Sequence, residues 1–270
     1  MTESMEFTGE RMVPERADPA TFWHHIYRYK FAIPYCRGKR ALDVACGEGY
    51  GCASILKGGA TSVIGVDISE EACRHARERY QVDARPGSAE SLPIPTASID
   101  TVVTFETIEH VPHPENFVRE CHRVLAPGGM MILSSPNRDL YRLRNGLNPY
   151  HCSEMSETEV ISLLGNYFEI TGVYGQYPEM RPAGLMNPGL WRFAPWTVMK
   201  GMNRVRRMTR ARWGNYFFTV PNEYYDDPAL AVLNETPDKC RILNPNIVRP
   251  RPRANHVDFV FYIITATRKS

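Results

Sequence analysis

Three acidic residues and a series of glycines lie close together in a pattern that can bind a ligand. Residues 41–51 read Ala-Leu-Asp-Val-Ala-Cys-Gly-Glu-Gly-Tyr-Gly, an apolar run followed by alternate glycines. Asp43 lies within the apolar run, Glu48 lies between the first two glycines, and Asp67 comes twenty residues after Gly47. Because glycine has no Cβ, such a turn lets the backbone approach a bound molecule closely. The simpler alternative is that the glycines only close a tight turn and that Asp67 caps the next helix.

The sign of the charge around this turn distinguishes between ligands. A loop that binds the pyrophosphate of a dinucleotide has Gly-x-Gly-x-x-Gly and presents backbone N–H groups to an anion. Here the third glycine is replaced by Cys52, and Asp43 and Glu48 would repel a pyrophosphate. The same carboxylates attract the ammonium and sulfonium groups of S-adenosylmethionine, and Asp67 can accept the two ribose hydroxyls. The residues therefore predict S-adenosylmethionine as the cofactor.

The elements that must position these residues alternate along the chain. Apolar, β-branched runs predict strands at 40–45, 62–67, 99–105 and 129–135, and helical patterns predict helices at 51–57, 69–80 and 114–125. This alternation is typical of a parallel sheet with helices on both faces.

Further elements are expected before and after this core. A helix is expected around 22–33, and a capping-box pattern at 156–159 predicts a helix that runs to Leu164. Strands are expected at 167–174 and, at the end of the chain, at 257–265.

The 270 residues, 43% of them apolar, are enough for one large core. We expect one cofactor-binding domain at 37–176 and 256–270, an N-terminal arm at 1–36 and an inserted substrate cap at 177–255. A net charge of +2 favours no class of partner. The acidic N-terminus and the lack of an apolar run of about 18 residues predict neither a signal peptide nor a membrane span. Seven scattered cysteines without metal-type spacing predict free thiols in the cytoplasm.

Several motifs resemble the class I S-adenosylmethionine-dependent methyltransferase superfamily. Residues 41–49 are similar to its first motif, 65–69 to its ribose-binding strand end, and 87–93 to its adenine-side loop, where Ser88 replaces a frequent Asp. Residues 105–111 resemble its fourth motif, and 123–129 the turn before its fifth strand. The resemblance implies an α/β, Rossmann-like fold with a seven-stranded, mostly parallel sheet and an antiparallel last strand.

The N-terminal arm and the matched motifs together imply a set of cofactor contacts. Residues 8–15 and 27–29 look like a subgroup that includes antibiotic and sugar methyltransferases, in which an arginine of the arm meets the cofactor carboxylate. Arg28 is the candidate for that contact. The full set of cofactor-binding residues implied by the resemblance is Arg28, Asp43, Ala45, Gly47, Glu48, Gly49, Asp67, Ile68, Ser88, Ala89, Glu90, Phe105 and Glu106.

Two histidines are candidates for the chemistry at the methyl group. Methyl transfer is an in-line displacement, and a base is needed when the acceptor is an alcohol that keeps its proton. His110 follows the strand at 99–105, at the edge where open α/β sheets bind ligands, and histidine exchanges protons near neutral pH. His151 lies in a loop expected to face the same cleft. The alternative is that His110 packs under the substrate and bonds a backbone carbonyl.

The same region also contains a possible metal-binding pattern. Glu106, Glu109, His110 and His151 form Glu-x-x-Glu-His…His, similar to the metal ligands of enzymes that methylate the terminal 2′-hydroxyl of small RNAs. Two carboxylates and two imidazoles can hold a divalent ion that lowers a hydroxyl pKa. Glu109 can instead face the junction between sheet and helices, and the other motifs of that RNA family are not evident, so no metal is expected and a metal stays an open alternative.

A basic segment lies within the expected cap. No acidic residue occurs between Met180 and Asn222, whereas eight cationic ones do: Arg181, Arg192, Lys200, Arg204, Arg206, Arg207, Arg210 and Arg212. This segment can be a solvated helix, a lid that grips an anionic group of the acceptor, or a surface for an anionic membrane or nucleic acid.

The expected function is methyl transfer from S-adenosylmethionine to a small molecule, to a hydroxyl of a sugar or other intermediate of natural-product biosynthesis. An anionic group on the acceptor and a homodimer are further options, and nucleic acid is not expected as a partner. The alternatives are an N- or C-methyltransferase of a small molecule, an RNA 2′-O-methyltransferase, and a non-catalytic module that binds the cofactor.

Overall fold

The computed structural model describes residues 12–14, 17, 19–178, 228–234, 240–243 and 261–269. Its first half contains α1 (Pro19–Cys36), β1 (Arg40–Val44), α2 (Tyr50–Lys57), β2 (Ser62–Asp67), α3 (Glu70–Tyr80), β3 (Asp83–Pro86), β4 (Ile99–Phe105), the short 3-10 helix η2 (Ile108–His110) and α4 (Pro114–Val124). The second half contains β5 (Leu125–Pro136), α5 (Arg138–Asn145), α6 (Glu157–Gly165), β6 (Phe168–Pro178), α9 (Pro228–Asn234), β7 (Cys240–Leu243) and β8 (Phe261–Arg268).

The strands form one sheet in the order β3-β2-β1-β4-β5-β8-β6-β7. Strands β1 to β5 pair in parallel, whereas β8 runs antiparallel to both β5 and β6. The expected mostly parallel sheet with an antiparallel last strand is confirmed. An eighth strand, β7, pairs antiparallel with β6 at the edge and comes from the segment expected to form the cap.

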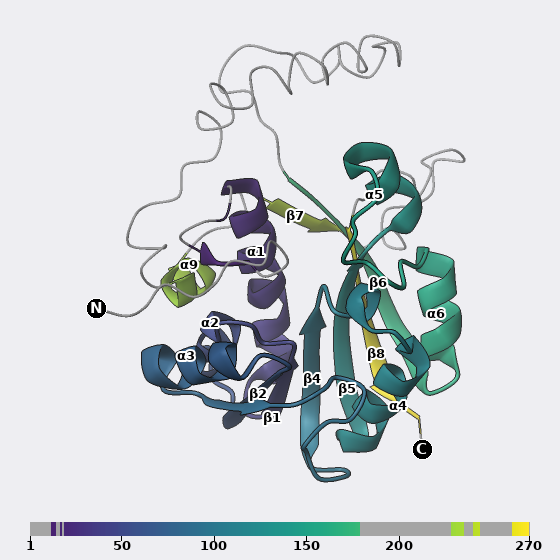
Figure 1. Cartoon of the computed structure of the whole chain (residues 1–270). Helices are drawn as coiled ribbons and strands as arrows, with labels where there is room; N and C mark the ends of the chain where they lie inside the picture. The colour runs from purple at the N-terminus through teal and green to yellow at the C-terminus, as the bar shows by residue number, and fades with distance from the viewer. Residues whose placement is uncertain are drawn as a thin grey trace.

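Helices cover both faces of the sheet, as the alternation of strands and helices predicted (Figure 1). On one face α1, α2 and α3 pack on side chains such as Val103 and Phe105 of β4. On the other face α4 and α6 pack on Val102 of β4 and on residues of β5 and β8. Because successive side chains of a strand point to opposite faces, β4 contributes to both cores and is central to the domain.

The predicted elements agree with the observed ones apart from their ends. The capping box is present: the backbone N–H of Glu159 donates to Ser156 Oγ, and the Glu159 carboxylate accepts from the Ser156 N–H. β5 begins at Leu125, four residues earlier than predicted, and the described part of the last strand begins at Phe261. The sequence analysis did not predict β3, α5 or β7.

Several expectations fall outside the described residues. Most of the expected cap, all of the basic segment, residues 8–11 of the arm and residues 257–260 are among these positions. Within the described part, no helix is long and apolar enough to cross a membrane. Six cysteines are free thiols, as expected: Cys36, Cys46, Cys52, Cys73, Cys121 and Cys152.

Close packing between α1 and α2 leads to a test of stability. A Cβ added at Gly51 would lie 2.1 Å from the ring of Tyr29. We expect Gly51→Ala to lower the free energy of unfolding by about 1–3 kcal/mol, because the ring must move. Gly165→Ala is the control, since nothing lies within 4 Å of its added Cβ, and we expect a change below about 1 kcal/mol. Urea unfolding of both variants measures this; equal stabilities would contradict the packing described.

Candidate active site

The turn after β1 brings backbone close to β2 and α3. Gly47 and Gly49 have φ values of 53° and 88°, which glycine adopts without strain. A Cβ at Gly49 would lie 2.4 Å from the Cβ of Ala76 on α3, so the turn packs directly on that helix. The Gly47 N–H donates to Asp67 Oδ2 at 2.8 Å. The glycines are therefore required both by the backbone conformation and by the packing.

Asp67 is held at the carboxyl end of β2. Besides the bond from Gly47, its Oδ1 accepts from the Ser69 N–H at 2.9 Å, and Ser69 Oγ caps α3. The next side chain, Ile68, is 83% exposed. The carboxylate is thus oriented by two backbone donors beside an exposed apolar side chain, as a binding site for a nucleoside requires.

The other two carboxylates of the turn are buried and contact groups of the protein. Asp43 has no exposed surface and accepts from the Tyr29 hydroxyl at 3.1 Å and from Cys52 Sγ at 3.5 Å. Glu48 is 2% exposed, and its Oε2 lies 3.8 Å from His75 Nε2 on α3. In this conformation both carboxylates face protein groups, and their contact with the cofactor stays a prediction.

The loop after β3 also differs from the expectation in detail. Ser88 Oγ accepts from the Glu90 N–H at 3.1 Å, which forms a local turn around Ala89. Glu90 Oε1 accepts from the His113 N–H at 2.7 Å and pairs with the His113 ring at 3.1 Å. The Glu90 carboxylate is therefore directed to the start of α4, whereas Ser88 and Ala89 remain half-buried at the same sheet edge.

Arg28 lies on α1 and is 1% exposed. Its Nε donates to Gln176 Oε1 at 2.7 Å, its Nη1 lies 3.4 Å from Glu106 Oε1, and its guanidinium stacks 4.5 Å from the Phe261 ring centroid. Neither Nη1 nor Nη2 makes a hydrogen bond within the described part of the chain. The side chain thus keeps donors for an anionic group next to the end of β4.

Two non-glycine residues with positive φ mark adjacent strand ends. Ala45 follows β1 with φ 61°, and Glu106 follows β4 with φ 52°. Glu106 is held by two contacts to Ser134, since its N–H donates to the Ser134 carbonyl and its Oε1 accepts from Ser134 Oγ at 2.8 Å. Strained backbone that surrounding contacts hold in place is typical of functional sites. The neighbouring Phe105 is buried and packs against Tyr29.

The two candidate histidines meet beyond the end of β4. Their ring centroids lie 4.8 Å apart. Ser153 brings them together: its N–H donates to the Glu109 carbonyl, and its hydroxyl contacts the carbonyls of Ile108 and Val111. The loop that carries His151 is thereby joined to η2, which carries His110.

Each imidazole is oriented through its Nδ1. His110 Nδ1 donates to the Tyr150 carbonyl at 3.1 Å, and His151 Nδ1 donates to Glu154 Oε1 at 2.7 Å. Glu154 also pairs with Arg142. Burial raises the pKa of Glu154, but the bonds from Arg142 and His151 have the larger effect, so the pKa of Glu154 is lowered. A proton fixed on Nδ1 leaves the lone pair of each ring on Nε2.

Glu109 lies behind the histidines in the buried turn. Its Oε2 accepts from Ser135 Oγ at 3.1 Å, and burial together with the charge of Glu106 raises the pKa of Glu109. Of the metal-type pattern, Glu109, His110 and His151 come together, with one ligand atom each within 4.8 Å of the others. The fourth member, Glu106, faces Ser134 and Arg28 instead.

Sequence reasoning missed several residues that build this site. Tyr29 and Gln176, which hold Asp43 and Arg28, are distant in sequence from the glycine turn and carry no local signal. Phe261 is likewise distant from its partner Arg28. Glu154 had a signal that could have been used, because His-x-x-Glu at 151–154 places a carboxylate near an imidazole.

Comparison with known proteins decides the family. The chain is 38% identical over 183 residues to a “probable S-adenosylmethionine-dependent methyltransferase” of Mycolicibacterium smegmatis, covering 66% of this chain and 70% of that protein. The chain belongs to the S-adenosylmethionine-dependent methyltransferases. The family model described as “Methyltransferase domain” matches residues 42–133 of this methyltransferase, from β1 to β5.

Other comparisons are consistent with this assignment. The methyltransferase is 41% identical over 112 residues to a ubiquinone biosynthesis O-methyltransferase of a Caulobacter species. The matched region covers 39% of this chain and 44% of that enzyme. The crystal structure of an S-adenosylmethionine-dependent methyltransferase from Thermotoga maritima superposes with a TM-score of 0.56 over 93% of this chain and 91% of that one, at 18% identity. The structural likeness concerns the fold, and S-adenosylmethionine is the cofactor of the family.

The burial of Asp43 predicts a pH dependence of stability. Burial raises its pKa to about 7, although bonds from Tyr29 and Cys52 lower it in part. In the unfolded chain its pKa is near about 3.9, so the folded protein binds the proton more tightly and loses stability as pH rises from about 4 to about 7. Asp43→Asn removes this titration. We expect the unfolding free energy of the variant, relative to the wild type, to be higher at pH 8 than at pH 5.

Asp100→Asn provides the matched control for this measurement. The side-chain bonds from Arg40 lower the pKa of Asp100 to about 2, so its stabilising effect is lost only below the unfolded value near about 3.9. The difference in unfolding free energy between Asp100→Asn and the wild type should not change between pH 5 and pH 8. Urea unfolding at the two pH values tests both variants, and a constant difference for Asp43→Asn would show that Asp43 is not buried as described.

Proposed function

We propose that this methyltransferase transfers a methyl group to a hydroxyl oxygen of a small molecule, such as a sugar or another natural-product intermediate. The observation that carries the proposal is the pair of imidazoles at the carboxyl end of β4, each with Nδ1 bonded to an acceptor. Two oriented bases are useful for an alcohol, which keeps its proton near neutral pH, and are not needed for a neutral amine. We further propose that the enzyme acts in the cytosol, which its free thiols support.

The residues of this chain fit the cofactor along one edge of the sheet. The glycine turn is open to close approach, Asp67 is oriented for ribose hydroxyls, and the exposed Ile68 can pack on the adenine ring. The donors of Arg28 suit the carboxylate of the methionine part. Ala45, Ser88, Ala89, Phe105 and Glu106 lie at the same edge and complete the proposed cofactor site. Asp43, Glu48 and Glu90 contact protein groups next to this edge, and their contact with the cofactor stays a prediction.

The chemistry required of the protein concerns the proton of the acceptor. When bound, S-adenosylmethionine supplies a methyl carbon that leaves its sulfur for the acceptor oxygen, and the sulfur keeps the electron pair. Nε2 of His110 or His151 takes the hydroxyl proton and later releases it to solvent. The Glu154 carboxylate accepts from His151 Nδ1 and so orients that ring.

Surface features near the histidines support a small acceptor. Leu147 and Tyr150 lie on the same loop as His151 and are 80% and 46% exposed. Such apolar surface beside polar groups is typical of small-molecule sites. The name of the Caulobacter relative also supports oxygen as the acceptor atom. An anionic acceptor group and a homodimer stay predictions.

A methylation assay tests the proposed function. The enzyme is incubated with S-adenosylmethionine and a panel of glycosylated, phenolic and aminated acceptors, and S-adenosylhomocysteine release and methyl incorporation are measured. We expect methylation of hydroxyl-bearing acceptors. Methylation confined to amines or carbon acceptors, or no turnover with any acceptor, would contradict it.

Substitution of the two histidines tests their role with an accepted substrate. We expect His110→Ala and His151→Ala each to lower kcat by about 10²–10⁴-fold, because general-base catalysis is lost. His122→Gln is the control, since His122 lies on α4 and contacts the Lys269 carbonyl. Unchanged kcat in both alanine variants would rule out the assignment.

A further inference from the structure

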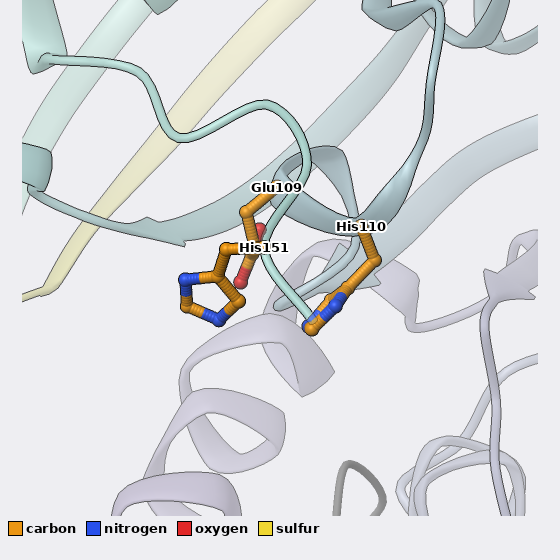
Figure 2. A group of neighbouring side chains, drawn as sticks. All are labelled: Glu109, His110 and His151. Carbon is orange, nitrogen blue, oxygen red and sulfur yellow. The ribbon is translucent and has the colours of Figure 1, made fainter. Parts of the chain in front are cut away.

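Glu109, His110 and His151 converge from two segments of the chain (Figure 2). Glu109 and His110 come from the turn after β4, and His151 comes from the loop after α5. One ligand atom from each lies within 4.8 Å of the other two. Ligand atoms bound to one transition-metal ion lie about 3–4 Å apart, given bond lengths of about 2.0–2.2 Å. The three side chains are therefore already grouped close to the spacing that one ion requires.

Outer contacts already orient each side chain for such a role. Metal-binding histidines typically donate their second ring N–H to a backbone carbonyl or a carboxylate. His110 Nδ1 donates to the Tyr150 carbonyl, and His151 Nδ1 donates to Glu154. Ser135 Oγ donates to Glu109 Oε2. All three contacts are those expected around a bound ion, and the contacts of the two imidazoles suit a general base as well.

Glu109 provides an independent observation that points to a ligand. Its side chain is 1% exposed, and its Oε1 has no hydrogen-bond partner in the described part of the chain. A buried carboxylate oxygen without a partner is costly, and most such atoms in folded proteins are satisfied. A cation bound between Glu109 and the two imidazoles satisfies this atom.

The surrounding charges also favour a cation. Three carboxylates, those of Glu106, Glu109 and Glu154, lie in or next to the cluster. Two guanidiniums oppose them, since Arg28 pairs with Glu106 and Arg142 pairs with Glu154. Each guanidinium is engaged by a carboxylate outside the three-residue set, so the ion pairs of Arg28 and Arg142 do not involve Glu109.

We propose that Glu109, His110 and His151 bind one divalent transition-metal ion at the acceptor end of the active site. Two imidazoles and one carboxylate are ligands for ions such as Zn²⁺, Co²⁺ or Fe²⁺, and three protein ligands leave a position open. With the ion bound, Nε2 of both histidines serves as a ligand instead of as the base proposed above, and an acceptor hydroxyl at the open position loses its proton to solvent more readily. This departs from the sequence expectation of no metal. It rests on the proposed function for the chemistry, but ion binding can be measured without any acceptor.

Calorimetric titration tests ion binding. The full-length protein, freed of metal with a chelator, is titrated with Zn²⁺, and we expect one ion per chain. Glu109→Gln, His110→Ala and His151→Ala each remove a ligand and should weaken binding by more than about 100-fold, since loss of an outer contact alone costs about 10–100-fold. His122→Gln should bind as the wild type does. An absence of stoichiometric binding by the wild type, or wild-type affinity in all three ligand variants, overturns the proposal.

A spectroscopic measurement covers the case in which a variant folds poorly. Co²⁺ bound to the wild type should give visible absorption bands that Glu154→Gln shifts, because that variant changes the partner of His151. We also expect Glu154→Gln to weaken Zn²⁺ binding by about 10–100-fold. Identical spectra and affinities for this variant would count against an oriented metal ligand at His151.

Activity with and without metal separates this inference from the proposed function. If chelated enzyme methylates its hydroxyl acceptor at the full rate, the catalytic metal is rejected and hydroxyl methylation stands. If Zn²⁺ binds at the cluster but no hydroxyl is methylated, the metal site stands and the proposed function is rejected. We expect turnover to fall by at least about 100-fold on chelation and to return on addition of the ion.

Discussion

The bond from the Gly47 N–H to the Asp67 carboxylate joins the ends of β1 and β2, and the cofactor side of the site is built around it. It requires that the backbone pass close to β2, which the positive φ values of Gly47 and Gly49 allow. α3 then packs directly on Gly49, and Ser69 both caps that helix and donates to Asp67. One local geometry thus orients the carboxylate, places the turn and positions the next helix. Loss of any one of these contacts would disturb the other two.

The acceptor side depends in a similar way on the end of β4. Glu106 adopts a left-handed conformation there, and Ser134 of the neighbouring strand holds it in place. η2 follows at once, and Ser153 joins the later loop to it, so two histidines that are far apart in sequence become neighbours. Arg28 contacts Glu106 from α1 and so links the two halves of the site. The proposed cofactor half and the proposed acceptor half of the site therefore meet at Glu106.

Local patterns predicted most of the sheet, the glycine turn and the capping box, because each is determined by residues close in sequence. The sequence did not reveal that Asp43 and Glu48 are buried, since that depends on Tyr29 of α1 and His75 of α3. It identified Arg28, but not its contacts with Gln176 and Phe261, which come from distant strands. It named the four residues of the metal-type pattern, whereas only the fold separates Glu106 from the other three. Short elements such as β3 and α5 have too few residues for a clear periodic pattern.

We propose that the methyltransferase binds S-adenosylmethionine over the glycine turn, with Asp67 as a direct contact. Calorimetric titration of the wild type with S-adenosylmethionine, beside Asp67→Ala and the surface variant Asp83→Ala, tests it most directly. Asp83 is exposed and pairs with Arg85. We expect one S-adenosylmethionine site per chain, an affinity lower by about 10–100-fold in Asp67→Ala, and an unchanged affinity in Asp83→Ala. An absence of binding by the wild type, or equal affinities in all three proteins, would contradict it.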